Sequence, residues 1–300
     1  MTTQTQATQL LKLIFKGRLD FGSQRTYDMV LRHWHTRIES YFKNDVLFKA
    51  ETVFSEEEFA FIVPQQTLMS TEKNWRSTTS ILKEIAQFAV AGHVGAWWVL
   101  NGQILDEQNI EPKSEKAAVT EFMLGRQLIE AGKRIEASEA LSRAIEKYEK
   151  HALAYERRGY VNYKLQNFND ALYDFSKSID LYPNNAEPYY GRGKIKMQRN
   201  EWESAASDFD YTIKRSFAVQ PIHWLARLRR GECLLQAKRY DEAAKELRFF
   251  MQRKFKDDDP NSRFAAKAAQ MLVECEKFVP ALPAATKSSG KGSAKSKGAR

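Results

Sequence analysis

The clearest pattern in this sequence is a set of small and apolar residues that recurs at a fixed spacing in its second half. Intervals of 34, 34 and 38 residues separate the members of three series: Gly125, Gly159, Gly193 and Gly231; Ala137, Ala171, Ala205 and Ala243; Leu141, Phe175, Phe209 and Leu247. A period of this size is typical of proteins built from repeated structural units. The sequence therefore predicts tandem repeats over roughly half of the chain.

Each repeat has the pattern of two amphipathic helices. In the second repeat, residues 154–166 and 169–182 both carry apolar residues at helical spacing, with a short polar turn at Asn167 between them. A glycine inside a helix costs about 1 kcal/mol relative to alanine, so a recurring glycine needs a compensating gain. Close approach of the two helices supplies it, and we expect Gly159 to face Ala171 with Phe168 and Phe175 beside them.

A further amphipathic segment follows the repeats and has the features of a capping helix. We expect Pro260 to begin this helix, with the acidic residues 257–259 at its N-terminus. Its apolar stripe consists of Phe264, Ala268, Met271, Leu272 and Cys275. A metal site at the acidic triplet is the less favoured alternative, because three consecutive carboxylates point in different directions.

Residues 1–112 lack the repeat and combine helical with strand-like patterns. Apolar stripes predict helices within residues 27–41 and 81–89. Runs rich in Val, Ile, Phe and Trp predict strands within residues 45–54, 57–63 and 93–100, and Asn101-Gly102 is typical of a two-residue hairpin turn. We therefore expect a small α+β domain, whose role the sequence does not reveal.

Length and composition fit this division. The chain has 300 residues, 43% of them hydrophobic, which suits two folded domains at residues 1–112 and 113–278. The formal net charge is +9, and residues 279–300 contain five basic residues and no acidic one. This Ala-, Ser-, Gly- and Lys-rich segment predicts a disordered basic tail, for which weak binding to polyanions is the less favoured reading.

Other sequence features narrow the functional class. The run "LLKLIF" is short and interrupted by Lys12, so we expect neither a signal peptide nor a membrane span, and a cytoplasmic protein. Cys233 and Cys275 are not in a C-x-x-C spacing, which argues against a disulfide framework or a zinc site. Both are expected to be buried thiols.

Candidate catalytic chemistry is sparse. His35 and Glu39, four residues apart on a predicted helix, could share a metal, but two ligands do not make a site, and His33 diverges from them. His93, beside an apolar strand, is the residue to test if activity were found. Motifs for phosphate, dinucleotide, nucleophile-elbow, zinc-protease and calcium chemistry are absent from the sequence, so we expect no enzyme activity, cofactor or metal.

The repeat resembles the tetratricopeptide repeat (TPR) family, whose 34-residue unit carries a small residue in the first helix and Ala and Phe in the second. The second repeat matches best, with Gly159, Phe168, Ala171, Phe175 and Pro183. The first repeat departs from the pattern, and a four-residue insertion around residues 216–220 precedes the fourth repeat. About four repeats cover residues 117–255. The resemblance implies a mainly α fold: a right-handed α-solenoid of helical hairpins with a carboxy-terminal capping helix, preceded by the small α+β domain.

In that family, first-helix residues line a concave groove that binds peptide segments of partner proteins. The resemblance places the following residues in the groove: Phe122, Arg126, Arg157, Tyr160, Tyr163, Lys164, Tyr190, Lys194, Met197, Leu228 and Arg229. Tyrosines beside an excess of positive charge suit an acidic segment with bulky apolar anchors. Alternatively, each tyrosine packs between adjacent first helices. The residues that hold chaperone tails in one TPR sub-class are not matched.

The function predicted from these observations is that of a non-enzymatic adaptor or scaffold that binds a partner protein in the groove. Two alternatives remain open. The amino-terminal domain could be a ligand-binding or catalytic module that the repeats bring to a target, or the basic groove and tail could bind nucleic acid. The identity of the partner and the oligomeric state are not predicted.

Overall fold

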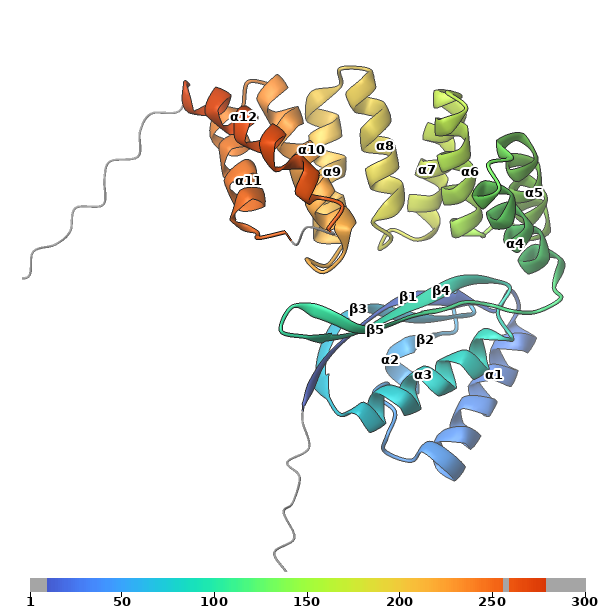
Figure 1. The fold of residues 1–300 in the computed structure, drawn as a ribbon. Coiled ribbons are helices and arrows are strands. Elements are labelled where there is room, and N and C mark those ends of the chain that lie inside the picture. Colours follow the sequence, from blue (N-terminus) through green and yellow to red (C-terminus); the bar gives the residue numbers. More distant parts are fainter. Residues whose placement is uncertain (1–9, 256–258, 279–300) are drawn as a thin grey trace, which may run out of the picture.

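The first part of the molecule is a five-stranded antiparallel sheet with helices on one face. The computed structural model describes residues 10–255 and 259–278. The strands are β1 (Leu11–Asp20), β2 (Phe54–Ser55), β3 (Ala60–Ser70), β4 (Ala91–Leu100) and β5 (Gln103–Ile110), in the order β2-β3-β1-β4-β5. On one side of the sheet lie α1 (Gln24–Arg37), the π-helical turn η1 (Ile38–Phe42), α2 (Ala50–Val53) and α3 (Glu72–Ala86), as Figure 1 shows.

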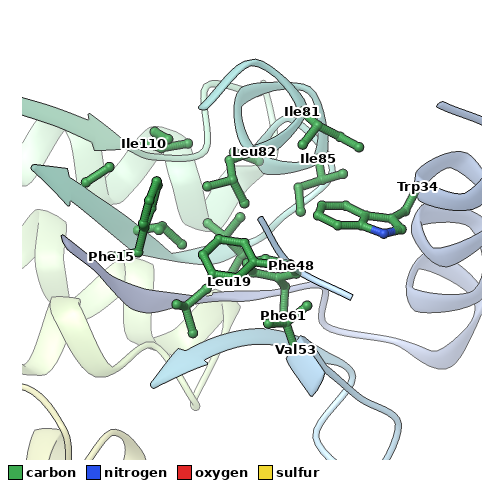
Figure 2. Close-up of a cluster of buried hydrophobic side chains, with 14 of the residues drawn as sticks. Phe15, Leu19, Trp34, Phe48, Val53, Phe61, Ile81, Leu82, Ile85 and Ile110 are labelled. Atoms are coloured by element: carbon green, nitrogen blue, oxygen red, sulfur yellow. The ribbon is translucent and has the colours of Figure 1, made fainter. Parts of the chain in front are cut away.

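The core of this unit lies between the sheet and those helices (Figure 2). Phe15 of β1, Trp34 of α1 and Phe61 of β3 are almost fully buried, and Ile81 and Leu82 of α3 close over them. Burying a side chain of this size contributes about 1.5–3 kcal/mol relative to its exposure. A cluster of this size accounts for a stable small domain.

The central strand β1 is not among the elements predicted from the sequence, where the run from Leu10 to Phe15 is considered only as a candidate targeting segment. In the structure β1 pairs with both β3 and β4, and both of its faces are covered, so Leu13, Ile14 and Phe15 are all buried. A strand that is covered on both sides lacks the alternation of apolar and polar residues that identifies a half-buried strand.

Two other predictions for this unit had different outcomes. The strand expected over residues 45–54 is wrong, because this segment is a loop followed by α2, and only Phe54 belongs to a strand. Its apolar residues face inward without extended pairing. The hairpin at Asn101-Gly102 is confirmed, with φ of 51° and 77°, the left-handed values that a tight two-residue turn requires.

The second part is a row of antiparallel helix pairs in which consecutive helices lie side by side (Figure 1). The four pairs are α4 (Ala117–Glu130) with α5 (Arg134–Lys147), α6 (Ala152–Lys164) with α7 (Phe168–Leu181), α8 (Glu187–Gln198) with α9 (Trp202–Lys214), and α10 (Pro221–Gln236) with α11 (Tyr240–Gln252). A 3₁₀ turn, η2 (Ser262–Phe264), and α12 (Ala265–Glu276) follow. The predicted solenoid of helical hairpins, with a small sheet domain before it, is confirmed.

The glycines mark the points where helices approach most closely. A Cβ atom on Gly159 would lie 3.0 Å from the ring of Phe175, and one on Gly125 would lie 2.7 Å from Leu141. The expected close approach is present, but the glycine faces the large residue of the second helix rather than Ala171. Gly191 is tighter still, since its Cβ would lie 2.4 Å from the Phe175 ring of the preceding repeat.

An ion-pair ladder that the sequence analysis did not foresee links successive repeats. Arg158 of α6 contacts Asp174 of α7 at 2.7 Å and donates to Ser142 of the preceding repeat at 3.0 Å. One repeat later, Arg192 contacts Asp208 at 2.8 Å in the same way. The aspartates are nearly completely buried. Removing Arg158 would therefore leave an uncompensated buried carboxylate, which is strongly destabilising, whereas Asp208 keeps a second cation, Lys196, at 2.8 Å.

The capping helix begins later than expected. Helix α12 starts at Ala265 rather than at Pro260, because residues 259–261 form a turn in which the Asn261 backbone N–H donates to the Asp259 carboxylate at 2.8 Å. Its apolar stripe is confirmed, with Ala268, Met271 and Cys275 buried against α11. Residues 257 and 258 and the predicted basic tail, residues 279–300, lie outside the described residues.

The free face of the sheet packs against the loops between repeats. Ile14, Trp97 and Val99 form an apolar cluster with Phe217 and Val219, and the rings of Trp97 and Phe217 lie 5.8 Å apart. Both solenoid residues belong to the insertion at residues 216–220 noted in the sequence. The insertion thus has a structural reason, since it carries the side chains that join the two parts of the chain.

The glycine packing predicts a specific stability effect. Gly191→Val should destabilise the protein by about 1–3 kcal/mol, because the new side chain overpacks against the Phe175 ring. The control Gln198→Val changes an exposed residue of the same helix and should cost much less. Thermal unfolding measures both. Adding Phe175→Ala to Gly191→Val should cost less than the sum of the single effects, and additive losses would contradict the packing.

The docking cluster predicts that the two parts can be separated. Replacing Phe217 and Val219 together by serine removes the apolar contact with Trp97 while leaving each part's own core intact. We expect an increased radius of gyration in small-angle X-ray scattering. The control Tyr173→Ser removes an exposed aromatic residue of α7 that is remote from the sheet and should leave the scattering unchanged. Identical curves for all three proteins would show that the cluster does not hold the parts together.

Candidate functional site

The residues predicted to line the groove lie on the four first helices, and seven of them form one cluster. The cluster comprises Tyr160, Tyr163 and Lys164 of α6, Tyr190, Lys194 and Met197 of α8, and Arg229 of α10. We call it the tyrosine–lysine cluster. The Lys194 ammonium lies 4.1 Å from the centre of the Tyr163 ring and 5.5 Å from that of Tyr190. Three successive repeats therefore contribute to one surface, since α6 lies against α8 and α8 against α10.

The cluster carries uncompensated positive charge. Within residues 10–255 and 259–278, neither Lys164 nor Lys194 forms a salt bridge, whereas Arg229 contacts Glu232 at 2.7 Å. Burial and the neighbouring charges of Lys164 and Arg229 lower the pKa of Lys194 to about 8, and Glu187 opposes this shift. Because burial and like charges disfavour the charged form of Lys194, a bound anion would stabilise that form strongly.

Two predicted groove residues are core residues. Leu228 is fully buried in the cluster shared by α10, α11 and the capping helix. Phe122 is 7% exposed, and its ring lies 4.7 Å from that of His151. The expectation that Leu228 contacts a partner is therefore wrong, because this side chain is buried in the core that α10 forms with its neighbouring helices. Phe122 still forms part of the wall of a neighbouring cavity.

The tyrosines combine both roles that the sequence left open. Tyr163 packs against Phe168, with ring centres 5.9 Å apart, and Tyr190 packs against Phe209 at 5.5 Å. Tyr160 remains 38% exposed. The first two therefore have one side in the helix packing, and Tyr160 is the most accessible of the three.

Arg126 and Arg157, the remaining predicted residues, line a cavity between the sheet and the solenoid. Its volume is about 240 Å³. The walls come from β1, β4 and β5, from α4 and the first turns of α6, α8 and α10, and from the loops that precede α8 and α10. Arg126 pairs with Glu111, and Arg157 lies 3.4 Å from Glu156. Part of the predicted groove thus faces this cavity, and the amino-terminal unit forms one of its walls. The sequence did not reveal this contribution of the amino-terminal unit.

Burial perturbs several charged groups in this cavity. It lowers the pKa of Lys16 to about 8, with the nearby Arg215 adding to the shift, and the Lys16 ammonium donates to the Arg215 carbonyl. Burial and the carboxylate of Glu156 raise the pKa of Glu187, although Glu187 keeps contact with solvent. Burial also lowers the pKa of His93, which keeps the imidazole neutral. Groups with perturbed pKa values that face one cavity make that cavity a candidate functional site.

The other candidates from the sequence do not assemble into a site. His33 Nε2 lies 3.2 Å from Glu84, and His35 and Glu39 are exposed. Cys233 and Cys275 are buried, and burial raises the pKa of Cys233 to about 12. In the part of the chain that the structure describes, no group of three or more His, Cys, Asp or Glu side chains could hold a metal ion.

Paired helices stacked around a surface made by the first helix of each pair define the class of α-solenoid repeat proteins. Residues 122–186 and 190–248 match the family model described as "Tetratricopeptide repeat". The helical part of this chain is therefore a TPR domain. TPR domains in general mediate interactions between proteins. The match does not extend to the sheet unit.

Several known proteins are similar to the helical part. The TPR repeat-containing thioredoxin TDX of Arabidopsis thaliana is 28% identical over 115 residues, which are 38% of this chain and 29% of that protein. This chain thus spans less than a third of that relative. The crystal structure of the MamA protein is 21% identical, with a TM-score of 0.42, over 51% of this chain and 76% of that one. YrrB, described as a TPR protein with an unusual peptide-binding site, is 18% identical, with a TM-score of 0.43, over 56% and 89%.

The helices of the described residues are also too short or too polar to cross a membrane. The longest of those in the repeats, α10, has 16 residues and contains three arginines. A membrane-spanning helix needs about 20 predominantly apolar residues.

The pKa of Lys194 leads to a prediction about pH. In the unfolded chain the pKa of this lysine is about 10.4, whereas in the folded protein it is about 8. Between these two pH values the unfolded state binds more protons than the folded state. The contribution of this lysine to the free energy of unfolding therefore rises with pH in that range. Lys194→Met removes that contribution. We expect the variant to be more stable than the wild type at pH 7, with a smaller advantage at pH 9.5. Melting temperatures at both pH values test this, and an advantage that grows with pH would contradict it.

Proposed function

We propose that this protein is a non-enzymatic, cytoplasmic adaptor that binds an acidic segment of a partner protein, anchored by apolar side chains, in the groove of its TPR domain. The tyrosine–lysine cluster carries the proposal. It joins three cations and three tyrosines from consecutive repeats, and two of the cations lack an acidic partner among the described residues. Carboxylates of the segment would pair with Lys164 and Lys194, and its apolar side chains would pack on the exposed part of Tyr160.

The charge arrangement distinguishes these two lysines from the arginines that join the repeats. Arg158 and Arg192 are already paired with buried aspartates and serve the packing of repeats. Lys164 and Lys194 have no such role. A charge that the fold does not neutralise is available to a ligand, and charge-assisted hydrogen bonds to carboxylates are about twice as strong as neutral ones.

The alternatives have weaker support. A thiol-based activity, as the name of the thioredoxin relative would suggest, needs an accessible cysteine with a lowered pKa, whereas Cys233 is buried and its pKa is raised. A ligand site in the amino-terminal unit alone has no support either, because the cavity has walls from both parts. The nucleic-acid alternative depends on the tail, which lies outside the described residues.

A peptide-display experiment tests the groove. Random 12-residue peptides selected on the full-length protein should become enriched in Asp and Glu together with aromatic or large aliphatic residues. Reversing Lys164 and Lys194 to glutamate should weaken the best peptide by about tenfold per site, at about 1.4 kcal/mol for each tenfold. Isothermal titration calorimetry measures the affinities.

The matched control reverses two exposed lysines of second helices, Lys177 and Lys245, to glutamate. It changes the net charge by the same amount and should leave the affinity within about twofold, since long-range electrostatics between exposed groups are screened. Equal losses in both double variants would show that the peptides respond to net charge alone. Peptides that bind both variants as tightly as the wild type would reject the groove as the binding surface.

A further inference from the structure

The sheet has a free edge at β5, and this edge borders the cavity. In the order β2-β3-β1-β4-β5, one side of β5 pairs with β4 and the other side has no partner strand in the described residues. An edge strand presents a row of N–H and C=O groups that can pair with another extended chain.

The residues that line the cavity include one face of β4 and a continuous stretch of β5. On β4, the lining residues are His93, Gly95 and Trp97, which alternate as expected for one face of a sheet. On β5 they are the consecutive residues Glu107, Gln108 and Asn109. Consecutive side chains point to opposite faces, so a cavity lined by all three meets the backbone of this stretch as well as the side chains of one face.

The two edges of the sheet are protected to different degrees. At the other edge, β2 covers the beginning of β3, and Pro64 interrupts the row of donors farther along that strand. Strand β5 has eight residues, Gln103–Ile110, with neither proline nor lysine among them. Natural proteins use charged side chains, proline and β-bulges to limit pairing at an edge. Strand β5 carries a bulge at Leu105 and the carboxylates Asp106 and Glu107, so its regular stretch for pairing is residues 107–110.

The cavity lies next to the tyrosine–lysine cluster, the surface on which the partner segment is proposed to bind. Its solenoid wall includes Arg157, which lies about one helical turn before Tyr160 and two turns before Lys164 on α6. Its volume of about 240 Å³ far exceeds the roughly 10–15 Å³ that one water needs. A chain that leaves the tyrosine–lysine cluster along α6 therefore enters the space beside β5.

The two regions differ in net charge. The cavity is lined by as many carboxylates as cations: Glu107, Glu111, Glu156 and Glu187 beside Lys16, Arg126, Arg157 and Arg215. The β5 side of the cavity carries Glu107 and Glu111, and within the described residues Glu107 accepts only the Trp97 indole N–H, at 2.8 Å. The tyrosine–lysine cluster is positive. A segment that spans both regions matches them when its acidic residues lie over the lysines and the part beside β5 carries no negative charge.

We propose that the partner segment, in extended conformation, adds to β5 as a sixth strand of the sheet while its acidic part occupies the tyrosine–lysine cluster. This inference rests on the proposed function. Main-chain hydrogen bonds to β5 would supply affinity with little dependence on sequence, and the cluster would supply selectivity. The sheet unit is then part of the binding site, since it holds one strand edge beside the groove.

Backbone methylation tests this mode of binding. The most enriched peptide from the display selection is synthesised as a series in which one amide nitrogen at a time carries a methyl group. Pairing with an edge strand uses the N–H of every second residue. Methylation at alternating positions should therefore weaken binding by about five- to tenfold, and the intervening positions should tolerate it.

A pair of protein variants provides an independent measurement. Asn109→Trp places a large side chain at a residue that lines the cavity, and it should weaken the peptide at least about tenfold. Gln103→Trp is the matched control, because Gln103 is exposed on the same strand but does not line the cavity. It should leave the affinity unchanged.

The outcomes separate the two proposals. Peptides that depend on Lys164 and Lys194 but show no alternation in the methyl series overturn strand addition and leave the groove intact, and so does a wild-type affinity for Asn109→Trp. Failure to enrich any peptide, or enrichment of peptides that ignore the lysines, overturns both proposals.

Discussion

Close approach of two helix backbones at a glycine is the constraint on which the solenoid depends. In each repeat the glycine of the first helix leaves room for a large side chain of the second, as Gly159 does for Phe175. Because the contact recurs with the repeat, every hairpin has nearly the same geometry as its neighbours. The first helices therefore collect on one surface, and the loops between repeats collect along one edge. The candidate site depends on both results.

The loops along that edge carry the docked sheet. Phe217 and Val219, from the insertion at residues 216–220, fill the contact with Trp97. Docking brings strand β5 into the wall of the cavity beside the first helices. A small insertion in one loop thus carries a contact that holds the sheet beside the groove, because its apolar side chains pack on the free face of the sheet.

Two sets of charges have different roles in this molecule. Arg158 and Arg192 neutralise buried aspartates and join repeats, so their charges are used by the fold. Lys194 lies among cations and aromatic rings, and its pKa is lowered. The sequence could nominate Lys194 through its position in the repeat, but it placed Leu228 in the same groove, because the repeat pattern alone does not show how the neighbouring helices bury this side chain. Spacing assigns a residue to a helix face, whereas burial depends on what packs against that face.

The amino-acid sequence by itself determined the repeat, the pairing of its helices, the apolar stripe of the capping helix and the tight turn at Asn101-Gly102, because each follows from local periodicity or from the conformational freedom of glycine. It did not reveal the central strand β1, the contact of the sheet with the loops, or the cavity between them. Those features join residues far apart in the chain, such as Trp97 and Phe217. Only the tertiary structure decides such contacts, since they depend on the relative placement of whole elements and leave no periodic signal in the sequence.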